Sequence, residues 1–437
     1  MARTLANGAA LAASMNKSGS AAGSLAALGA RLDKVGLPQA ANVLRPVRAV
    51  PTCFPWVDTT LGISGWPTDR YALVHGPSNK GKSVFTLGLC YSFVQSDHPA
   101  LYIDAERTTP ITWARQLMGA HADSPIFRAK KPKSYEETVA DVRAFCEAIG
   151  EAKAKGEVDE NTTGIVIVDS LRKLVPQKML DQMMKEFSDT ATQGRNDRKG
   201  IDGANGMAAR IKAALNAQWA DELTALLDDT GTCLVAIARE YQKQKVNDWD
   251  LDYVLGGGSA IFFEASVTAR IDESGRVLDD DKRLLATEHS VSILKTKVGH
   301  KEERYPRAFF HLASGAEEGV PYGFDRARDV LVFARHLGLV TGGWNAFNGQ
   351  NLGQGESNAL RLLRNDPGML RRVETACRLS KVPADAVVEV VEGGGQEIPA
   401  MEQNAPKDTH SPKQQSKPAR TRASATKGKQ AGKGPKR

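Results

Sequence analysis

A loop between an apolar segment and a helical segment constrains this chain more than any other feature. The loop comprises Gly76, Pro77, Ser78, Asn79, Lys80, Gly81, Lys82 and Ser83. Its glycines allow backbone N–H groups to surround a phosphate, and the N-terminus of the following helix adds partial positive charge. We expect Lys82 to contact the β- and γ-phosphates of a nucleoside triphosphate and Ser83 to bind Mg²⁺. A plain glycine-rich turn is the alternative, but the apolar segment before the loop and the helix after it favour a phosphate site.

Two further apolar segments end in carboxylates. Ile165–Val168 precede Asp169, and Leu101–Ile103 precede Asp104 and Glu106. At the carboxyl ends of parallel strands, such carboxylates face a bound nucleotide. We expect Asp169 to bind Mg²⁺ and Glu106 to orient water for attack on the terminal phosphate. For Glu106, an acid that caps a helix after a strand is the alternative.

Strand-like and helix-like segments alternate from about Pro51 to Pro321. The expected strands are Tyr71–His75, Ala100–Ala105, Gly164–Ser170, Thr232–Ala238, Ser266–Ile271 and Ser290–Lys297, and the expected helices are Lys82–Val94, Ile111–Leu117, Tyr135–Ala154 and Met207–Leu227. This alternation predicts an α/β fold with a mainly parallel central sheet covered by helices on both faces. The last strands have no helix between them, which predicts an antiparallel extension of the sheet.

The chain is expected to contain four regions. These are an N-terminal helical arm for subunit contact (1–50), the ATPase core (51–322), a small α+β C-terminal domain with two helical stretches around a glycine-rich loop (323–395), and a basic disordered tail (396–437). The arm carries Leu25, Leu28 and Leu32 at helical spacing, an apolar stripe suited to a partner groove. Residues 1–40 are poor in acids, so an organellar transit peptide is the alternative.

Positive charge is concentrated in the tail. Residues 403–437 hold ten Lys or Arg and one Asp, so the preceding residues have a formal net charge of −2 although the whole chain carries +7. Such a tail is typical of a non-specific nucleic-acid tether, and a solubilising or localisation segment is the alternative. No apolar run approaches the roughly 20 residues that cross a bilayer, so no membrane partner is expected.

The cysteines indicate a reducing compartment. There are five, an odd number, and none forms a C-x-x-C pair. We therefore expect neither a zinc site nor a disulfide framework, and we expect a cytoplasmic protein unless the transit-peptide alternative holds.

Several motifs, in the same order, resemble those of the RecA recombinase family. They are Leu61–Ser83, Asp104–Glu106, Trp113–Leu117, Val168–Ser170, Gly206–Arg210, Gly257–Ala260, Lys295–Lys297, Gly343–Trp344 and Gly353–Ala359. The resemblance covers about residues 50–380. The number and order of the motifs make it specific. The divergence of the sequence between them indicates a bacteriophage-type or otherwise outlying member.

The resemblance implies a RecA-like P-loop NTPase core that uses ATP and Mg²⁺. It implies that Glu106 is the catalytic glutamate and that Trp113 stacks on adenine. It also implies that Lys295 and Lys297 reach across a protomer interface to the neighbour's ATP.

Three positions depart from the family pattern. Arg239 stands where the family has a glutamine that senses the γ-phosphate, and arginine can still contact phosphate through its planar fork. Pro110 stands where an acid recognises adenine, which puts base selectivity in doubt. Ser259 replaces a usual asparagine.

Two segments, residues 177–205 and 240–258, correspond to the family's DNA-binding loops. The expected DNA contacts in and beside them are Lys185, Arg195, Arg198, Lys199, Arg210, Tyr241, Lys243, Lys245, Trp249, Gly257 and Gly258. Cations among aromatics suit a single strand, whose bases stack and whose phosphates need neutralising. Solvated surface loops are the alternative, and the acids around Trp249 argue against a simple phosphate track.

The resemblance implies a DNA-dependent ATPase that forms helical filaments on single-stranded DNA and promotes pairing and strand exchange with homologous duplex DNA. One alternative is a ring-forming helicase or other nucleic-acid motor on the same core. Another is a non-catalytic, ATP-switched protein that coats single-stranded DNA. The Gly353–Ala359 motif and the lysine pair favour the filament, and the presence of Lys82, Glu106 and Asp169 favours catalysis.

Overall fold

The structure is a computed structural model. It describes residues 26–37, 40, 46–181, 219, 222–242, 253–256, 260–278, 282, 284–299, 307–308, 310–311 and 323–380.

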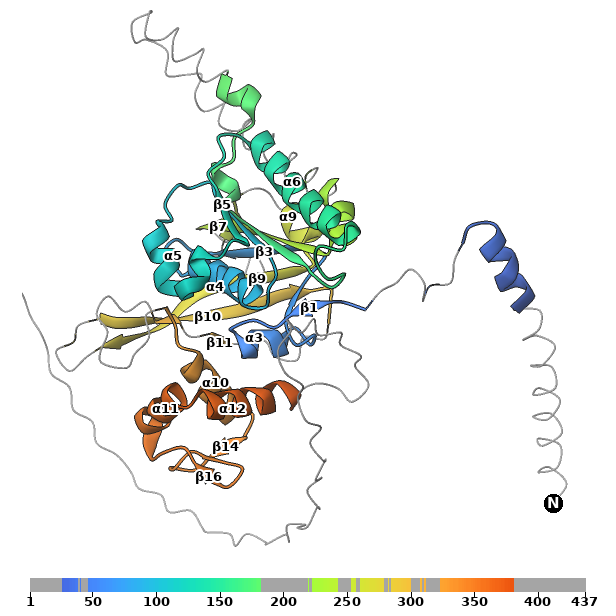
Figure 1. Ribbon diagram of the computed structural model, residues 1–437. Helices are drawn as coiled ribbons and strands as arrows, with labels where there is room; N and C mark the ends of the chain where they lie inside the picture. Colours follow the sequence, from blue (N-terminus) through green and yellow to red (C-terminus); the bar gives the residue numbers. More distant parts are fainter. Residues whose placement is uncertain are drawn as a thin grey trace, which may run out of the picture. The chain divides into compact units, whose positions relative to one another are not determined.

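A mixed nine-stranded sheet forms the centre of the fold (Figure 1). Its strands are β3 (Tyr71–Gly76), β4 (Ala100–Asp104), β5 (Phe127–Lys130), β6 (Gly164–Asp169), β7 (Thr232–Gln242), β8 (Tyr253–Leu255), β9 (Val267–Leu278), β10 (Leu284–Thr296) and β11 (Arg307–Ala308). They lie in the order β11-β10-β9-β3-β7-β6-β4-β5, and β8 pairs with the end of β7. Strands β5, β4, β6, β7, β3 and β9 are neighbours in this order, and each pairs parallel with the next. Strand β10 pairs antiparallel with β9 and with β11, and β8 pairs antiparallel with β7. The predicted α/β fold and its antiparallel extension are confirmed.

Some strands differ from their predicted bounds. Strands β7, β9 and β10 extend well beyond the apolar segments that marked them, because backbone pairing continues into polar residues, as in the register of Arg276 with Thr287. The short strand β5 was not predicted. It lies at the edge of the sheet, and Arg128 and Lys130 on it are exposed, so it lacks the apolar pattern of a buried strand.

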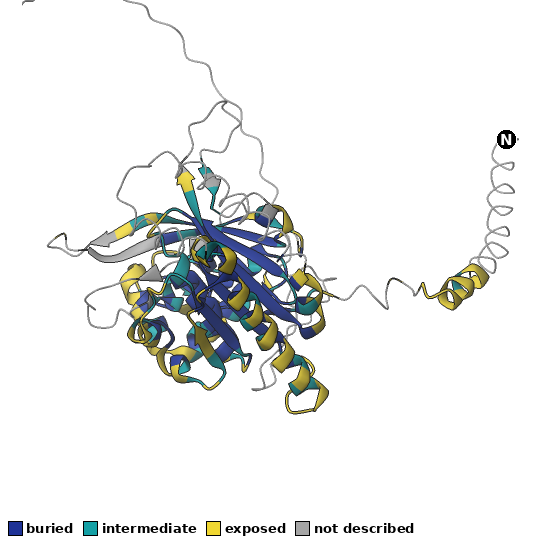
Figure 2. Cartoon of the chain, turned by 90° about the horizontal axis from the view of Figure 1, so that it is seen from above, coloured by how far each residue is buried: buried dark blue, intermediate teal, exposed yellow. Residues whose placement is uncertain are grey.

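Helices cover both faces of the sheet, and the strands between them are buried (Figure 2). On one face lie α4 (Lys82–Gln95), α5 (Ile111–Met118) and the short helix η1 (Gly119–Asp123), whose apolar side chains pack on those of alternate strand residues. On the other face lie α6 (Tyr135–Ala154), α9 (Ala260–Glu264) and helical residues 222–230. Helix α6 has the predicted bounds, and its start is fixed by Ser134, whose hydroxyl accepts the Glu137 N–H at 3.2 Å.

The C-terminal region has an apolar core of its own. It contains α10 (Arg326–His336), the strands β14 (Val340–Thr341), β15 (Ala346–Phe347) and β16 (Gln350–Asn351), α11 (Gly355–Asn365) and α12 (Pro367–Leu379). We predicted two helical stretches here, and the described residues hold three. The break between α11 and α12 falls at Asp366, whose carboxylate accepts the Met369 N–H at 2.9 Å, and Pro367 follows as the first helical residue.

The residues before the central sheet form short elements. These are β1 (Ala49–Val50), α3 (Pro55–Thr60) and β2 (Trp66–Pro67). Further upstream, residues 26–34 are helical, and Leu28 and Leu32 of the predicted apolar stripe are 49% and 42% exposed. Leu25 lies outside the described residues, and subunit contact through this arm stays a prediction. Among the helices that the structure describes, none is both long enough and apolar enough to cross a membrane.

A buried charge cluster joins α12 to the segment around α3. The Arg378 guanidinium donates to Asp58 at 2.6 Å, to Glu374 at 2.8 Å and to the Thr52 carbonyl at 2.8 Å. Asp58 is fully buried, and it also accepts the Thr52 N–H and hydroxyl, each at 2.7 Å. Burial raises the pKa of Asp58 and Arg378 opposes that rise. Breaking a buried ion pair leaves an uncompensated charge, so this cluster is expected to matter for folding.

We expect Arg378→Ala to lower the free energy of unfolding by about 3–5 kcal/mol, because it leaves the buried Asp58 carboxylate without a compensating charge. Urea titration followed by circular dichroism measures this loss. Arg371→Ala, an exposed arginine on the same helix, is the control and should change little. A double variant, Asp58→Asn with Arg378→Met, should recover part of the stability. Equal effects of Arg378→Ala and the control would contradict the role of the cluster.

Candidate active site

The glycine-rich loop from Gly76 to Ser83 takes its shape from contacts with neighbouring strands. Gly76 ends β3 with φ +148°, and a Cβ at this position would lie 2.2 Å from the Ile271 carbonyl oxygen of β9. Gly81 has a left-handed φ of +83°, and a Cβ there would meet the ring of His289 from β10. Both positions therefore require glycine. From Lys82 the chain enters α4, so the loop leads directly into the N-terminus of the helix.

A cavity of about 290 Å³ opens in front of this loop. It is lined by Ser78, Asn79, Lys80, Gly81, Lys82, Ser83, Val84, Glu106, Trp113, Asp169, Ser170, Ile237 and Arg239. The cavity thus brings together side chains from the loop, the ends of β4, β6 and β7, and α5. These elements meet because the carboxyl ends of parallel strands lie at one edge of the sheet.

Asp169 is the most buried carboxylate of the cavity, at 4% exposure. Its Oδ2 atom accepts two hydroxyl hydrogen bonds, from Ser83 at 2.5 Å and from Tyr102 at 2.6 Å. Burial raises the pKa of Asp169, and the Ser83 and Tyr102 bonds oppose that rise. Burial and the Asp169 charge raise the pKa of Tyr102 well above its usual value, so its hydroxyl remains a donor. Ser83 and Asp169 present a hydroxyl and a carboxylate, which are ligand types that Mg²⁺ prefers.

Glu106 is held at the cavity by contacts with the last residue of β6 and with the residue that follows it. Ser170 donates its hydroxyl to Glu106 Oε1 at 2.7 Å, and the Glu106 N–H donates to the Asp169 carbonyl at 3.1 Å. The register of β4 and β6 pairs Asp104 with Asp169, which places the two segments side by side. Asp104 itself accepts the backbone N–H groups of Thr108 and Thr109, each at 3.1 Å, so it stabilises the turn after β4.

Two cations enter the cavity, and their charges act on each other. Lys82 donates to the Pro77 carbonyl at 2.5 Å, and Arg239 donates to the Ser78 hydroxyl at 2.8 Å. Burial lowers the pKa of Lys82, Asp169 opposes that shift, and the Arg239 charge adds to it. An anion between these two groups would relieve their mutual repulsion.

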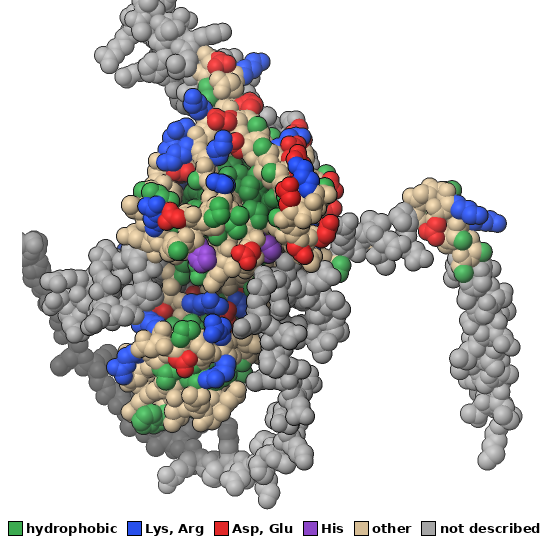
Figure 3. All heavy atoms as spheres, in the orientation of Figure 1, with side chains coloured by type: hydrophobic (Ala, Val, Ile, Leu, Met, Phe, Trp, Pro, Cys, Tyr) green, Lys and Arg blue, Asp and Glu red, His purple; other side chains and the backbone are tan. Residues whose placement is uncertain are grey.

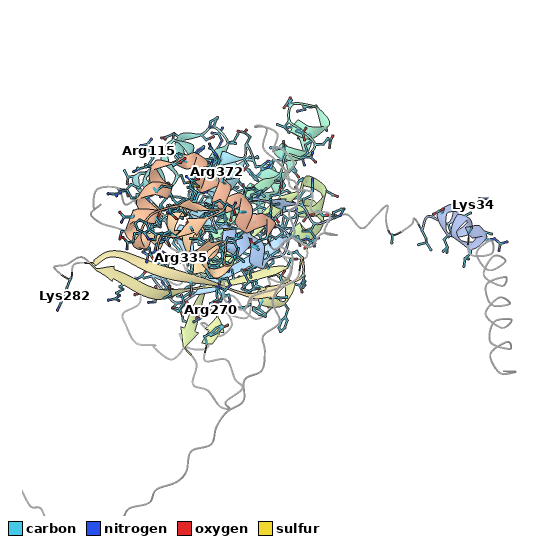
Figure 4. All side chains as sticks on the ribbon, turned by 90° about the horizontal axis from the view of Figure 1, so that it is seen from below. Lys34, Arg115, Arg270, Lys282, Arg335 and Arg372 are labelled. Carbon is cyan, nitrogen blue, oxygen red and sulfur yellow. The ribbon has the colours of Figure 1, made fainter. Side chains whose placement is uncertain are left out.

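Successive residues of β7 face different surroundings. Arg239 lines the cavity, whereas Glu240 accepts from His75 at 2.8 Å and from Arg270 at 2.8 Å and 3.1 Å. Burial raises the pKa of Glu240, but His75 and Arg270 outweigh that effect and hold it below its usual range. Arg270, labelled in Figure 4, also lies 5.6 Å from the Tyr253 ring on β8. The hairpin of β7 and β8 is therefore fastened to β3 and β9 directly beside the cavity.

Of the expected DNA contacts, the structure describes Tyr241 alone. Its side chain is 39% exposed, and the Arg172 guanidinium lies 5.6 Å from its ring. Lys185, Arg195, Arg198, Lys199, Arg210, Lys243, Lys245, Trp249, Gly257 and Gly258 lie outside the described residues. On the face of the molecule seen in Figure 3, basic and acidic side chains are interspersed.

Lys295 and Lys297 lie away from the cavity of their own chain. Both donate to backbone carbonyls at the end of α9: Lys295 to Phe262 at 2.8 Å and to Phe263 at 2.5 Å, and Lys297 to Phe263 at 3.1 Å. Phe263 is 66% exposed beside them. Contact with a neighbour's ATP stays a prediction for this pair.

Sequence reasoning missed several groups around the cavity. It did not single out Ser170, Tyr102 or the ion-paired set of His75, Glu240 and Arg270. The position of Ser170 directly after Asp169 was a usable signal. The other groups come together only through strand pairing across the sheet, so no local pattern marks them.

Comparison with known proteins gives one family. A family model described as the RecA N-terminal domain matches residues 35–304, more than half of the chain. The chain is 27% identical to Protein RecA of Haemophilus ducreyi (strain 35000HP / ATCC 700724) over 334 residues, covering 76% of this chain and 77% of that protein. It is 27% identical to Protein RecA of Mannheimia haemolytica over 347 residues, covering 79% and 81%.

Among solved structures, the crystal structure of the RadB recombinase matches with a TM-score of 0.36 and 13% identity, covering 59% of this chain and 93% of that one. The span of the family match includes the loop from Gly76 to Ser83, Glu106, Asp169 and β7. The chain belongs to the RecA family.

Proposed function

We propose that this protein is a DNA-dependent ATPase that forms filaments on single-stranded DNA and promotes pairing and strand exchange with homologous duplex DNA. The observation that carries the proposal is the arrangement of Lys82, Glu106 and Asp169 around one cavity in front of a phosphate-binding loop. Membership of the RecA family supports the DNA part, which the cavity alone does not address.

The residues that line the cavity have different roles in ATP hydrolysis. Lys82 and the loop N–H groups bind the β- and γ-phosphates, and Arg239 adds a second positive charge near Ser78. Trp113 lines the cavity and offers a ring on which adenine can stack. Ser83 and Asp169 would hold Mg²⁺, which neutralises phosphate charge when bound.

Glu106 supplies the base. The Ser170 hydroxyl occupies one carboxylate oxygen, Oε1, and thereby restrains the orientation of the side chain. A restrained carboxylate at the cavity wall can orient a water molecule and accept its proton as the water attacks the γ-phosphate.

The hairpin of β7 and β8 connects the ATP site with the surface that would bind DNA. Arg239 lies at the cavity, and two residues later Tyr241 is exposed beside Arg172. Residues two apart on a strand share a face, so the side chains of Arg239 and Tyr241 lie on the same face of β7. Exposed aromatics near cations suit stacking with the bases of a single strand.

ATPase assays with and without single-stranded DNA, with negative-stain microscopy of the same sample, test the proposal as a whole. Stimulated turnover and helical filaments are expected. Closed rings would favour a motor instead, and filaments without turnover would favour a coating protein.

We expect Lys82→Ala to abolish ATP hydrolysis, because it removes the cation that binds the β- and γ-phosphates. A phosphate-release assay measures turnover. Lys155→Ala, at an exposed position after α6, is the control and should hydrolyse ATP normally. Retention of more than about a tenth of the wild-type rate, roughly 1.4 kcal/mol in barrier, would contradict the assignment of Lys82.

We expect Glu106→Gln to bind ATP normally and to slow hydrolysis by about 100-fold or more, because an amide cannot accept the proton. Nucleotide binding is measured with a fluorescent ATP analogue and turnover by phosphate release. Glu151→Gln on the exposed face of α6 is the matched control. Parallel loss of ATP binding would show that Glu106 is structural.

We expect the double variant Lys295→Ala and Lys297→Ala to lose filament growth and cooperative ATPase while its isolated protomers still bind nucleotide. The reason is that both lysines lie outside the cavity of their own chain, beside the exposed Phe263. Electron microscopy and the Hill coefficient of the ATPase measure the effect. Normal filaments would refute an interface role.

A further inference from the structure

A buried tyrosine next to the cavity has no role in the function proposed above. Tyr102 lies on β4, is 2% exposed, and packs in the apolar cluster beneath α4 and α5. A phenylalanine would serve equally well as an apolar core residue at this position. A buried hydroxyl is costly unless it is hydrogen-bonded, so its presence is explained by its partner. That partner is Oδ2 of Asp169, at 2.6 Å.

The contacts of Asp169 are unequal between its two oxygens. Oδ2 accepts from both Tyr102 and Ser83, whereas none of the described residues donates to Oδ1. Ser83 is itself an expected metal ligand, so its hydroxyl cannot be counted as a permanent donor to Asp169. Tyr102 is then the donor that holds the carboxylate whether or not a cation is present.

The sheet makes Tyr102 a rigid support. Strands β4 and β6 pair in register, with Tyr102 opposite Ile167 and Asp104 opposite Asp169. The hydroxyl therefore reaches Asp169 from a fixed strand rather than from a loop. Groups that hydrogen-bond to a metal ligand orient it and tune its affinity for the ion.

We propose that Tyr102 is a positioning residue for the metal-binding carboxylate: its hydroxyl holds Asp169 through Oδ2 and so strengthens binding of the divalent cation that accompanies ATP. The inference rests on the proposed nucleotide site, and it adds a residue to which neither the family motifs nor the cavity lining assigns a role.

The test is Tyr102→Phe, which deletes one oxygen and keeps the ring. Mn²⁺ is titrated into the full-length protein with a non-hydrolysable ATP analogue, and free Mn²⁺ is followed by electron paramagnetic resonance. We expect the dissociation constant for Mn²⁺ to rise by about tenfold, the lower end for loss of a group that supports a ligand. Binding of the analogue in EDTA should be unchanged, because Tyr102 does not line the cavity.

Tyr71→Phe is the matched control, since Tyr71 is also buried in the central sheet but packs on the opposite face. It should leave Mn²⁺ affinity at the wild-type value. Tyr102→Met, which also lacks the hydroxyl and adapts to apolar surroundings, serves as a second variant if Tyr102→Phe does not fold.

The outcomes separate the inference from the function on which it rests. Wild-type Mn²⁺ affinity in the Tyr102 variants would overturn the inference and leave the nucleotide site intact. Equal weakening of Mn²⁺ and of metal-free nucleotide would also overturn it, because the defect would then be a general loss of structure. Absence of nucleotide binding by the wild-type protein would overturn both.

Discussion

The carboxylate of Asp169 is the point at which the elements around the cavity are joined. It lies at the end of β6 and accepts hydrogen bonds from Ser83 at the start of α4 and from Tyr102 on β4. The backbone carbonyl of the same residue accepts the N–H of Glu106. A charge at 4% exposure is costly to bury, so the surrounding donors and any bound cation must compensate for it. The site therefore depends on the parallel sheet bringing the ends of β3, β4 and β6 together.

Strand β7 of the same sheet extends from the cavity to the surface, where Tyr241 is exposed. Strand β7 contributes Arg239 to the cavity and then continues as a hairpin with β8, fastened by Glu240 to His75 and Arg270. Because side chains alternate along a strand, Arg239 faces the cavity whereas the next residue, Glu240, fastens the hairpin. Glu240 is bonded to His75 on the adjacent strand β3 and to Arg270 on β9, one strand further along the sheet, and so it restrains the hairpin.

Arg239 gives this member of the family a site with more positive charge than a glutamine at the same position would give. Lys82 is half-buried, and its pKa is lowered by burial and also by the Arg239 charge, so the cavity places two cations that repel each other close together. Binding of a triphosphate removes that repulsion, which favours the bound state over the free state.

The sequence by itself determined the chemistry of the site. The spacing of Gly76 to Ser83, the apolar strands that end at Asp104 and Asp169, and the strand–helix alternation predicted a phosphate loop, its carboxylates and an α/β sheet, because these patterns depend on local backbone preference and on burial. The tertiary structure decided the rest. Tyr102, Ser170 and the set of His75, Glu240 and Arg270 come together only through the order and register of strands far apart in the chain. The apolar pattern did not mark the edge strand β5, because most of its residues are exposed at the edge of the sheet. It did not mark the division of α11 from α12 either, which depends on the Asp366 cap before Pro367. Local patterns report which residues are buried and where the chain turns, but strand pairing sets which of them meet, and pairing is stabilised by contacts that no short segment contains.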